Sequence, residues 1–527
     1  MATSDLSIIS LLSFTAIVII IFSNLASSLA SSSSSICDLT PYPAFCKSNS
    51  PSRGRSDIHS YGRLFARKSL TSSTRFRSLV SRYLKHPSRN NLSDSMVLAL
   101  KDCYLLSDLN VDFWTNTLNT INSTDTLSSS EDEDSLHSMI SATLTNHDTC
   151  LDSLRQATTT HQDESLISSI SNGTMFYSIS LAFFKHGWGR GRGRGRKLVQ
   201  LDFAGDVTVS QTVVVNPDGS GDYTTINDAV GAAPNNTRGI NGFFVIYVVA
   251  GVYEEYVYIP KTKQYLMMIG DGINQTIVTG NRSVVDGWTT FNTATFAVVA
   301  QGFVAVNMTF RNTAGAINHQ AVALRSGADL SAFYSCSFEG YQDTLYTHSM
   351  RQFYRNCDIY GTVDFIFGNA AVVFQDCNIY PRLPMSNQFN AITAQGRTDV
   401  NQNTGTSIHN CTIMAAADLA ASNGTTQTYL GRPWKQYSRT VYMQSFMDSL
   451  INPLGWSAWS GDFALDTLYY AEYDNWGPGS NTSSRVTWPG YDVTLDGIGA
   501  VNFTVSNFIF GDFWLPATGV PFLAGLS

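Results

Sequence analysis

A short unit that recurs about every twenty residues in the second half of the chain constrains the fold more than any other feature. The unit combines apolar residues with a cysteine and appears at residues 333–338, 353–359, 373–379 and 408–413. Cys336, Cys357 and Cys377 are spaced 21 and 20 residues apart. This period is too short for a strand–helix–strand unit. It matches one coil of a parallel β-helix, in which equivalent residues stack into ladders.

The stacking raises the question of disulfide bonds between coils. Neighbouring coils lie about 4.8 Å apart, which falls within the Cα separation that a disulfide tolerates. The spacing permits Cys357–Cys377 and Cys336–Cys357 equally, and a buried ladder of free thiols is the third possibility.

Composition agrees with a β-rich second half. From Leu198 onward, short β-rich runs are separated by Gly, Asn and Asp, and only residues 226–233 show a helical period. The 39 Gly, 24 Tyr and 30 Phe suit strands joined by tight turns. A chain of 527 residues with 43% hydrophobic residues is too apolar to be disordered and predicts more than one core.

Charge is divided unevenly along the chain. Residues 1–197 carry 19 basic and 16 acidic side chains, whereas residues 198–527 carry 14 and 25. Binding to phosphates needs clustered positive charge, so the acidic second half argues against nucleic acid as a partner.

The N-terminus predicts secretion. An apolar stretch over residues 8–22 precedes small residues up to Ala30, so residues 1–30 are expected to be a signal peptide that contacts the membrane only during secretion. A signal anchor is the alternative, because Asp5 stands where basic residues are usual. Glycosylation sequons fit the secretory route. They lie at Asn91, Asn122, Asn172, Asn235, Asn274, Asn281, Asn307, Asn410, Asn423, Asn481 and Asn502.

Residues 31–185 are expected to form a separate helical domain, since apolar residues recur there at three- and four-residue spacing. In a secreted protein, its four cysteines predict the disulfides Cys37–Cys46 and Cys103–Cys150. The acidic run at residues 131–134 is expected to be a solvated loop.

Residues 186–200 contain a run of alternating Gly and Arg at 189–196, a composition that predicts an unpacked linker. Such a linker exposes the basic pair Arg196 and Lys197 to proteolytic processing. A plain spacer is the alternative. Secretion disfavours nucleic-acid binding by the tract.

Two aspartates carry the candidate chemistry. Asp343 and Asp364 are 21 residues apart, so they are expected on one face of consecutive coils. Either one alone is typical of a turn, but adjacent carboxylates have pKa values that are pushed apart, which supplies an acid and a base. Tyr341, Phe365 and Phe367 are expected to raise the pKa of Asp343.

Other polar and aromatic residues fit around this pair. Gln320 precedes Gln342 by about one coil, and two amide donors suit a developing oxyanion. Arg432 is expected to lower the pKa of Asp364, and Trp434 offers a flat face for a sugar ring. The sequence has no Gly-x-Ser-x-Gly elbow near a histidine and no zinc-type spacing of His and Cys, which disfavours a serine hydrolase and a zinc site.

These motifs make the second half of the chain resemble one known protein family. Residues 213–522 resemble plant pectinesterases at 221–226, 247–255, 286–290, 320–325, 341–346, 361–368 and 430–434. The resemblance implies a right-handed parallel β-helix catalytic domain over residues 201–527. It also implies roles for particular residues: Asp364 as nucleophile, Asp343 as proton donor, Gln320 and Gln342 at the oxyanion, Arg432 and Trp434 in the substrate cleft, and a Cys357–Cys377 disulfide.

The first half resembles the pectinesterase inhibitor domain, an all-α helical bundle, at residues 37–46, 102–108 and 141–152. In such relatives the linker is cut at a dibasic-Leu-Leu sequence, and Val199 departs from that pattern here.

The implied reaction is hydrolysis of galacturonate methyl esters in cell-wall pectin, without a cofactor, by a secreted enzyme. The expected partners are pectin and an inhibitor domain, either its own or a separate one. Two alternatives are a β-helical polysaccharide hydrolase or lyase and a non-enzymatic wall-binding protein.

Overall fold

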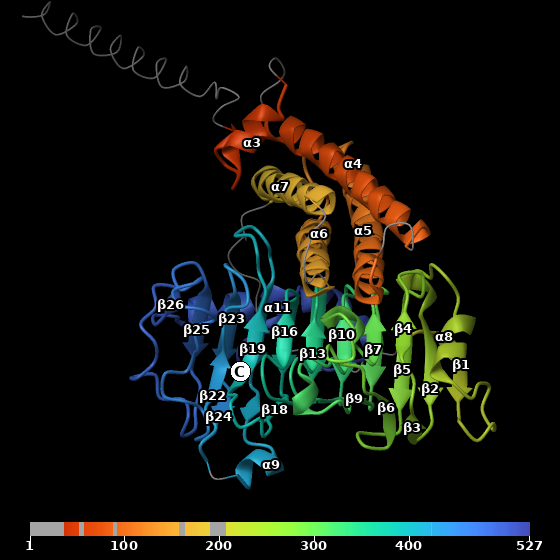
Figure 1. Ribbon diagram of the computed structural model, residues 1–527, viewed down its shortest axis with the longest axis vertical. Coiled ribbons are helices and arrows are strands. Elements are labelled where there is room, and N and C mark those ends of the chain that lie inside the picture. Colours follow the sequence, from red (N-terminus) through yellow and green to blue (C-terminus); the bar gives the residue numbers. More distant parts are fainter. Residues whose placement is uncertain (1–35, 52–56, 88–91, 158–163, 190–206, 423) are drawn as a thin grey trace, which may run out of the picture.

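The computed structural model describes residues 36–51, 57–87, 92–157, 164–189, 207–422 and 424–527. The expected signal peptide and the pair Arg196 and Lys197 lie outside these residues. A helical part stands on one side of a long β-part (Figure 1). No helix in the described ranges is long and apolar enough to cross a membrane.

The helical part is a bundle of four long helices and one short one. They are α3 (Pro43–Ser48), α4 (Ile58–Lys85), α5 (Asp94–Ile121), α6 (Ser130–Ala157) and α7 (Glu164–Gly187). The side chains of Asp57 and Ser93 cap α4 and α5 by accepting backbone N–H bonds. The bundle encloses fully buried side chains such as Trp114 and Tyr177.

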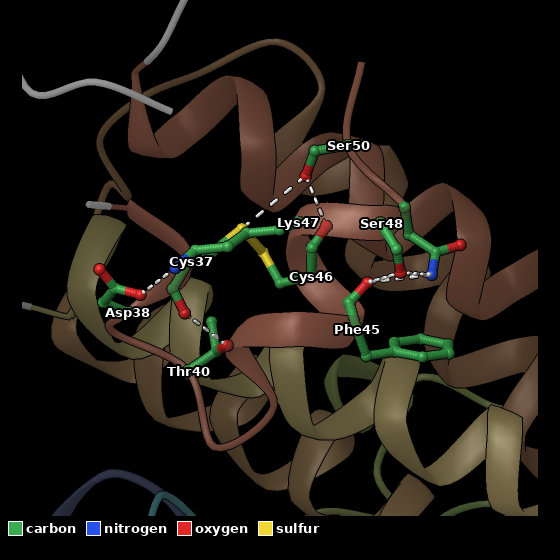
Figure 2. The surroundings of a disulfide bond; sticks show 9 residues. Cys37, Asp38, Thr40, Phe45, Cys46, Lys47, Ser48 and Ser50 are labelled. Carbon is green, nitrogen blue, oxygen red and sulfur yellow. Dashed lines mark hydrogen bonds and ion pairs between the residues drawn. A yellow bond between two sulfur atoms is a disulfide. The ribbon is translucent and has the colours of Figure 1, made fainter. Parts of the chain in front are cut away.

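Both disulfides predicted for this part are present. Cys37–Cys46 ties α3 to the segment before it, beside Phe45 (Figure 2). Cys103–Cys150 joins α5 to α6.

The bundle extends beyond the boundary expected at residue 185. Helix α7 continues to Gly187, and Trp188 is buried. The Trp188 ring stacks on Phe184 and its indole N–H donates to Thr124 O at 3.1 Å. Residues 186–188 therefore belong to the bundle, because an aromatic anchor outweighs the glycine-rich composition around it.

The β-part is a parallel β-helix, in which successive coils contribute strands to three parallel sheets. The eleven-stranded sheet has the order β1 (Val209–Val215), β2 (Phe243–Val248), β5 (Leu266–Gly270), β8 (Val304–Val306), β11 (Ser331–Tyr334), β14 (Arg351–Arg355), β17 (Ala371–Gln375), β20 (Gly405–His409), β23 (Arg439–Met443), β25 (Tyr469–Tyr473) and β26 (Tyr491–Asp492). The eight-stranded sheet has the order β24 (Phe446–Met447), β21 (Thr412–Ile413), β18 (Asn378–Pro381), β15 (Asp358–Gly361), β12 (Ser337–Glu339), β9 (Thr309–Asn312), β6 (Thr276–Gly280) and β3 (Gly251–Tyr253).

The third sheet has seven strands and faces the helical part (Figure 1). Its order is β22 (Thr428–Gly431), β19 (Asn390–Gln395), β16 (Ile366–Gly368), β13 (Leu345–Thr347), β10 (Leu324–Ser326), β7 (Phe296–Val298) and β4 (Val257–Ile259).

Short helices complete the β-part. The expected helix near residue 226 is present as α8 (Ile226–Ala232). The others are α9 (Ala417–Ala420), α10 (Gly497–Ala500), α11 (Val505–Phe508), α12 (Gly511–Trp514) and the 3₁₀ turns η1 (Gly239–Asn241), η2 (Thr290–Asn292), η3 (Ala316–Asn318), η4 (Val501–Phe503) and η5 (Leu515–Thr518). Buried residues of α10–α12 cover the outer face of the eleven-stranded sheet.

The recurring unit of the sequence is a corner of the coil. The residue before each cysteine, at Ser335, Asn356, Asp376 and Asn410, has a φ between 51° and 55°. Short polar side chains tolerate this left-handed conformation better than branched or bulky ones. The repeat therefore marks the point where the chain leaves the eleven-stranded sheet for the eight-stranded one.

The cysteines that follow these corners form a buried ladder of free thiols, so the expected Cys357–Cys377 disulfide is absent from the structure. Each thiol donates to a carbonyl of the preceding coil: Cys357 Sγ lies 3.4 Å from Phe333 O, and Cys377 Sγ lies 3.5 Å from Tyr354 O. Stacking in parallel register points equivalent side chains the same way, so each thiol contacts backbone carbonyls and the neighbouring thiols of the ladder without a bond between the sulfurs. Burial also raises the pKa of the Cys357 thiol well above its usual range.

Candidate active site

Asp343 and Asp364 occupy equivalent corners of consecutive coils, just before β13 and β16. Both adopt positive φ angles, 61° and 53°. The Asp343 N–H donates to Val363 O at 3.1 Å, which fixes the two coils against each other. Only 7% of Asp343 and 5% of Asp364 is exposed. The structure therefore brings the two aspartates together, as their spacing predicts.

Arg432, which follows β22, binds Asp364 in a bidentate manner. Its Nε lies 2.7 Å from Oδ1 and its Nη2 lies 2.7 Å from Oδ2. Two parallel charge-assisted hydrogen bonds hold the carboxylate in one orientation and favour its ionised form.

The pKa values of the two aspartates are both raised. Burial raises the pKa of Asp343 well above its usual range, and the negative charge of Asp364 adds to this effect. Burial also raises the pKa of Asp364, and Arg432 offsets only part of the increase. Arg432 lowers the pKa of Asp364 as expected, but removal from water outweighs the guanidinium, so the net shift is upward. Asp343 remains the harder of the two to ionise.

The two glutamines line up with the aspartates along consecutive coils. The Ala321 N–H donates to Gln342 O at 3.2 Å, which places Gln320 one coil before Gln342. Both side chains are half-buried. Gln342 Oε1 is buried and has no hydrogen-bond partner within the described residues.

Trp434 packs near the aspartates on the rings of Phe367 and Tyr346, and we call these two rings the aromatic floor. Its ring centroid is 5.9 Å from that of Phe367 and 6.5 Å from that of Tyr346. Gly396 lies directly against the indole: a Cβ at this position would come 2.8 Å from Trp434 Cε3. The close approach of glycine backbone therefore helps to fix the ring.

Sequence reasoning missed two aromatic residues of the site. The guanidinium of Arg432 lies 4.3 Å from the ring centroid of Trp459 and 5.4 Å from that of Phe389. Neither residue carries a motif or spacing that relates it to Arg432, so no sequence signal indicated this contact.

The helical part covers the aromatic floor. Tyr346 and Phe367 are 3% and 4% exposed because they share a hydrophobic cluster with residues of α5 and α6 such as Leu106 and Leu154. Thr149 Oγ1 of α6 lies 3.0 Å from His348 Nε2. Figure 1 shows α5 and α6 standing against the strands around β7, β10 and β13.

Ion pairs also join the two parts. Lys435 Nζ lies 2.8 Å from Asp148 and 2.8 Å from Asp152, both on α6. Arg351 binds Asp329 of its own part at 2.7 Å and Asp134 of α6 at 3.0 Å. The acidic run at residues 131–134 is therefore not a solvated loop. It lies in the first turns of α6, and Asp134 is buried against an arginine 217 residues away.

Asp102 of α5 is a further buried carboxylate at this interface. It accepts a hydrogen bond from Thr289 Oγ1 at 2.6 Å and another from Asn292 Nδ2. Burial raises the pKa of Asp102 to about 6, although these hydrogen bonds and Arg325 act in the opposite direction.

Comparison with known proteins agrees with this arrangement of a β-helix and a helical bundle. The family described as "Pectinesterase" matches residues 212–512, and the family "Plant invertase/pectin methylesterase inhibitor" matches residues 31–183. The protein "Probable pectinesterase/pectinesterase inhibitor 41" of Arabidopsis thaliana is 54% identical over 549 residues, covering 94% of this chain and 95% of its own. "Pectinesterase 2" of Citrus sinensis is 60% identical over 331 residues, covering 63% of this chain and 62% of its own.

A solved structure, "Pectin methylesterase from Carrot", matches the β-part with a TM-score of 0.58 and 57% identity, covering 60% of this chain and 98% of its own. Asp343, Asp364 and Arg432 all lie within the region that the first family matches. The chain therefore belongs to the pectinesterase family, as a carboxylic ester hydrolase that carries an inhibitor-family domain ahead of its β-helix.

Proposed function

We propose that this protein hydrolyses galacturonate methyl esters in cell-wall pectin, releasing methanol and leaving carboxylates on the polymer. The observation that carries the proposal is the unequal pair of buried aspartates, of which only Asp364 is held by Arg432 within the described residues. A neutral acid beside an ionised carboxylate provides a proton donor and a nucleophile at one pH.

In the proposed mechanism, Asp364 attacks the ester carbonyl while the amides of Gln342 and Gln320 stabilise the oxyanion. Asp343 then protonates the departing methoxide, which leaves as methanol. Water attacks the acyl-enzyme and gives its proton to Asp343. Asp364 is released as a carboxylate, and the polymer keeps the new carboxyl group, which loses its proton to solvent. The aromatic face of Trp434 supports a sugar ring during these steps.

In the structure the helical part covers the region around Trp434, and we call this the closed arrangement. It affects when the enzyme can act. Helices α5 and α6 bury Tyr346 and Phe367 beside Trp434, where the polymer would lie. We therefore expect the enzyme to act in the cell wall after secretion, once cleavage at Arg196 and Lys197 lets the helical part leave.

The experiment that tests the proposal is secreted expression followed by a methanol-release assay on highly esterified pectin. N-terminal sequencing of the secreted enzyme tests the cleavage site in the same preparation. Wild-type protein should release methanol without shortening the polymer, and Asp364→Asn should not release it. Shortening of the polymer without methanol would instead favour a polysaccharide hydrolase or lyase.

A further inference from the structure

Lys435 lies next to the aromatic floor but takes both of its anionic partners from the helical part. Its ammonium contacts Asp148 and Asp152 of α6 at 2.8 Å each and lies 4.8 Å from the ring centroid of Trp434. Its side chain is only 16% exposed. A largely buried ammonium is stable only with such partners, because removal from water is costly for a charge.

Departure of α6 removes both carboxylates at once. The ammonium of Lys435 is then left beside Trp434, three residues after the Arg432 that holds Asp364. Another carboxylate can then pair with the ammonium in place of Asp148 and Asp152. The polymer of the proposed reaction supplies one, since each hydrolysed ester leaves a carboxylate on a sugar ring.

We propose that Lys435 is a substrate-binding residue that recognises a free galacturonate carboxylate, and that Asp148 and Asp152 take the place of that carboxylate in the closed chain. This inference rests on the proposed function. A methyl ester is neutral and offers the ammonium no charge, whereas a free carboxylate forms a charge-assisted hydrogen bond. Lys435 therefore favours binding of pectin that already carries carboxylates near the ester to be cut.

Lys261 offers a matched control. Its ammonium also binds two aspartates of the helical part, Asp108 at 2.6 Å and Asp112 at 2.5 Å, both on α5. It follows β4, which lies at the opposite edge of the seven-stranded sheet from β22 and Arg432. Replacement of either lysine removes a comparable pair of interdomain ion pairs, but of the two lysines only Lys435 lies beside Trp434.

The test compares secreted, linker-cleaved wild-type protein with Lys435→Gln, Lys435→Arg and Lys261→Gln prepared in the same way. Methanol release is measured on fully methyl-esterified polygalacturonate and on a half-esterified polymer of the same length. The quantity compared is the ratio of the two KM values within each variant, because a change in the fraction of open enzyme affects both substrates alike.

Lys435→Gln should raise the KM on the half-esterified polymer relative to the esterified one by about tenfold to a hundredfold, the size expected for a hydrogen bond to a charged group. It should weaken competitive inhibition by unesterified oligogalacturonate to a similar extent. Lys435→Arg and Lys261→Gln should keep both wild-type values within about twofold, the range of an exposed ion pair.

Equal KM ratios and equal inhibition constants in Lys435→Gln and Lys261→Gln would overturn the role of Lys435 while leaving the esterase intact. A wild-type protein that releases no methanol from either polymer would instead overturn the proposed function.

Discussion

Arg432 donates two parallel hydrogen bonds to Asp364, each 2.7 Å long, and within the described residues it makes none to Asp343. The two aspartates are otherwise alike in burial, backbone conformation and position in the coil. One guanidinium therefore breaks the symmetry of the pair. We expect it to decide which carboxylate attacks and which gives a proton.

The nucleophile can be tested by Asp364→Asn, which is nearly isosteric but is a poor nucleophile. Methanol release should fall by about 10⁴-fold or more, as for loss of other catalytic nucleophiles. The circular dichroism spectrum should stay that of the wild type. A variant that unfolds, or that keeps near-normal turnover, would show that Asp364 has another role.

The orientation of Asp364 can be tested by Arg432→Lys, because a point charge does not reproduce a bidentate contact. We expect kcat to fall at least about tenfold, since the reacting oxygen is no longer fixed. Arg311→Lys is the matched control: Arg311 binds Glu339 at 2.6 Å in the eight-stranded sheet, away from the aspartates. Equal losses in the two variants would indicate a general effect on the fold.

The role of Asp343 predicts a pH dependence. Its pKa is raised by burial and by Asp364, so it stays protonated to higher pH than an ordinary carboxyl and activity should fall as pH rises through its pKa. Asp343→Asn should remove this alkaline limb and slow methyl ester hydrolysis by about 10²–10⁴-fold. Aryl esters, whose leaving group needs little protonation, should lose much less. Equal losses on both ester classes would contradict the assignment.

Attachment of the helical part should weaken as pH rises. The pKa of Asp102 is about 6 at the interface, and it should return to about 4 once the carboxyl is exposed to water. The docked state therefore binds this proton more tightly, so the contribution of Asp102 to docking is fully present below about pH 4 and falls by roughly 3 kcal/mol as pH rises past 6. Burial raises the pKa of Asp134 and Asp152 as well, which adds in the same direction.

This dependence can be measured as release of the helical part from linker-cleaved protein by size-exclusion chromatography across pH 4–8. Asp102→Asn does not titrate, so it should flatten the response of the wild type. If more of the helical part is released at low pH than at high pH, the proposed link between protonation of Asp102 and docking is contradicted.

Gly396 provides a test of how tightly Trp434 must be placed. Gly396→Ala puts a Cβ 2.8 Å from the indole, so the ring must move. We expect kcat/KM to fall by about tenfold to a hundredfold, the cost of a misplaced substrate. Gly231→Ala in α8 meets no atom within 4 Å and should instead stabilise the protein by about 0.5–1 kcal/mol without changing kcat/KM. An unchanged kcat/KM in Gly396→Ala would argue against the substrate role of Trp434.

The period of the repeat was enough to predict the architecture of the β-part and the pairing of its aspartates. A β-helix is a one-dimensional stack, so a period of about twenty residues fixes which positions are neighbours. Asp343 and Asp364, and Gln320 and Gln342, are related by that period. The two disulfides of the bundle could also be predicted, because four cysteines in a secreted helical domain can pair in only a few ways.

The contacts between the two parts, and their effect on the pKa values at the interface, could not be predicted from the repeat. Asp134 pairs with Arg351 from 217 residues away, and no period relates a residue of α6 to a strand of the β-helix. The pKa of Asp364 depends on its burial, and the absence of a disulfide at Cys357 depends on the direction of its side chain. Both properties are set by all of the surrounding residues together. Spacing along the chain encodes contacts within a repeat, whereas contacts between separate folded surfaces depend on which faces bury each other with the lowest free energy.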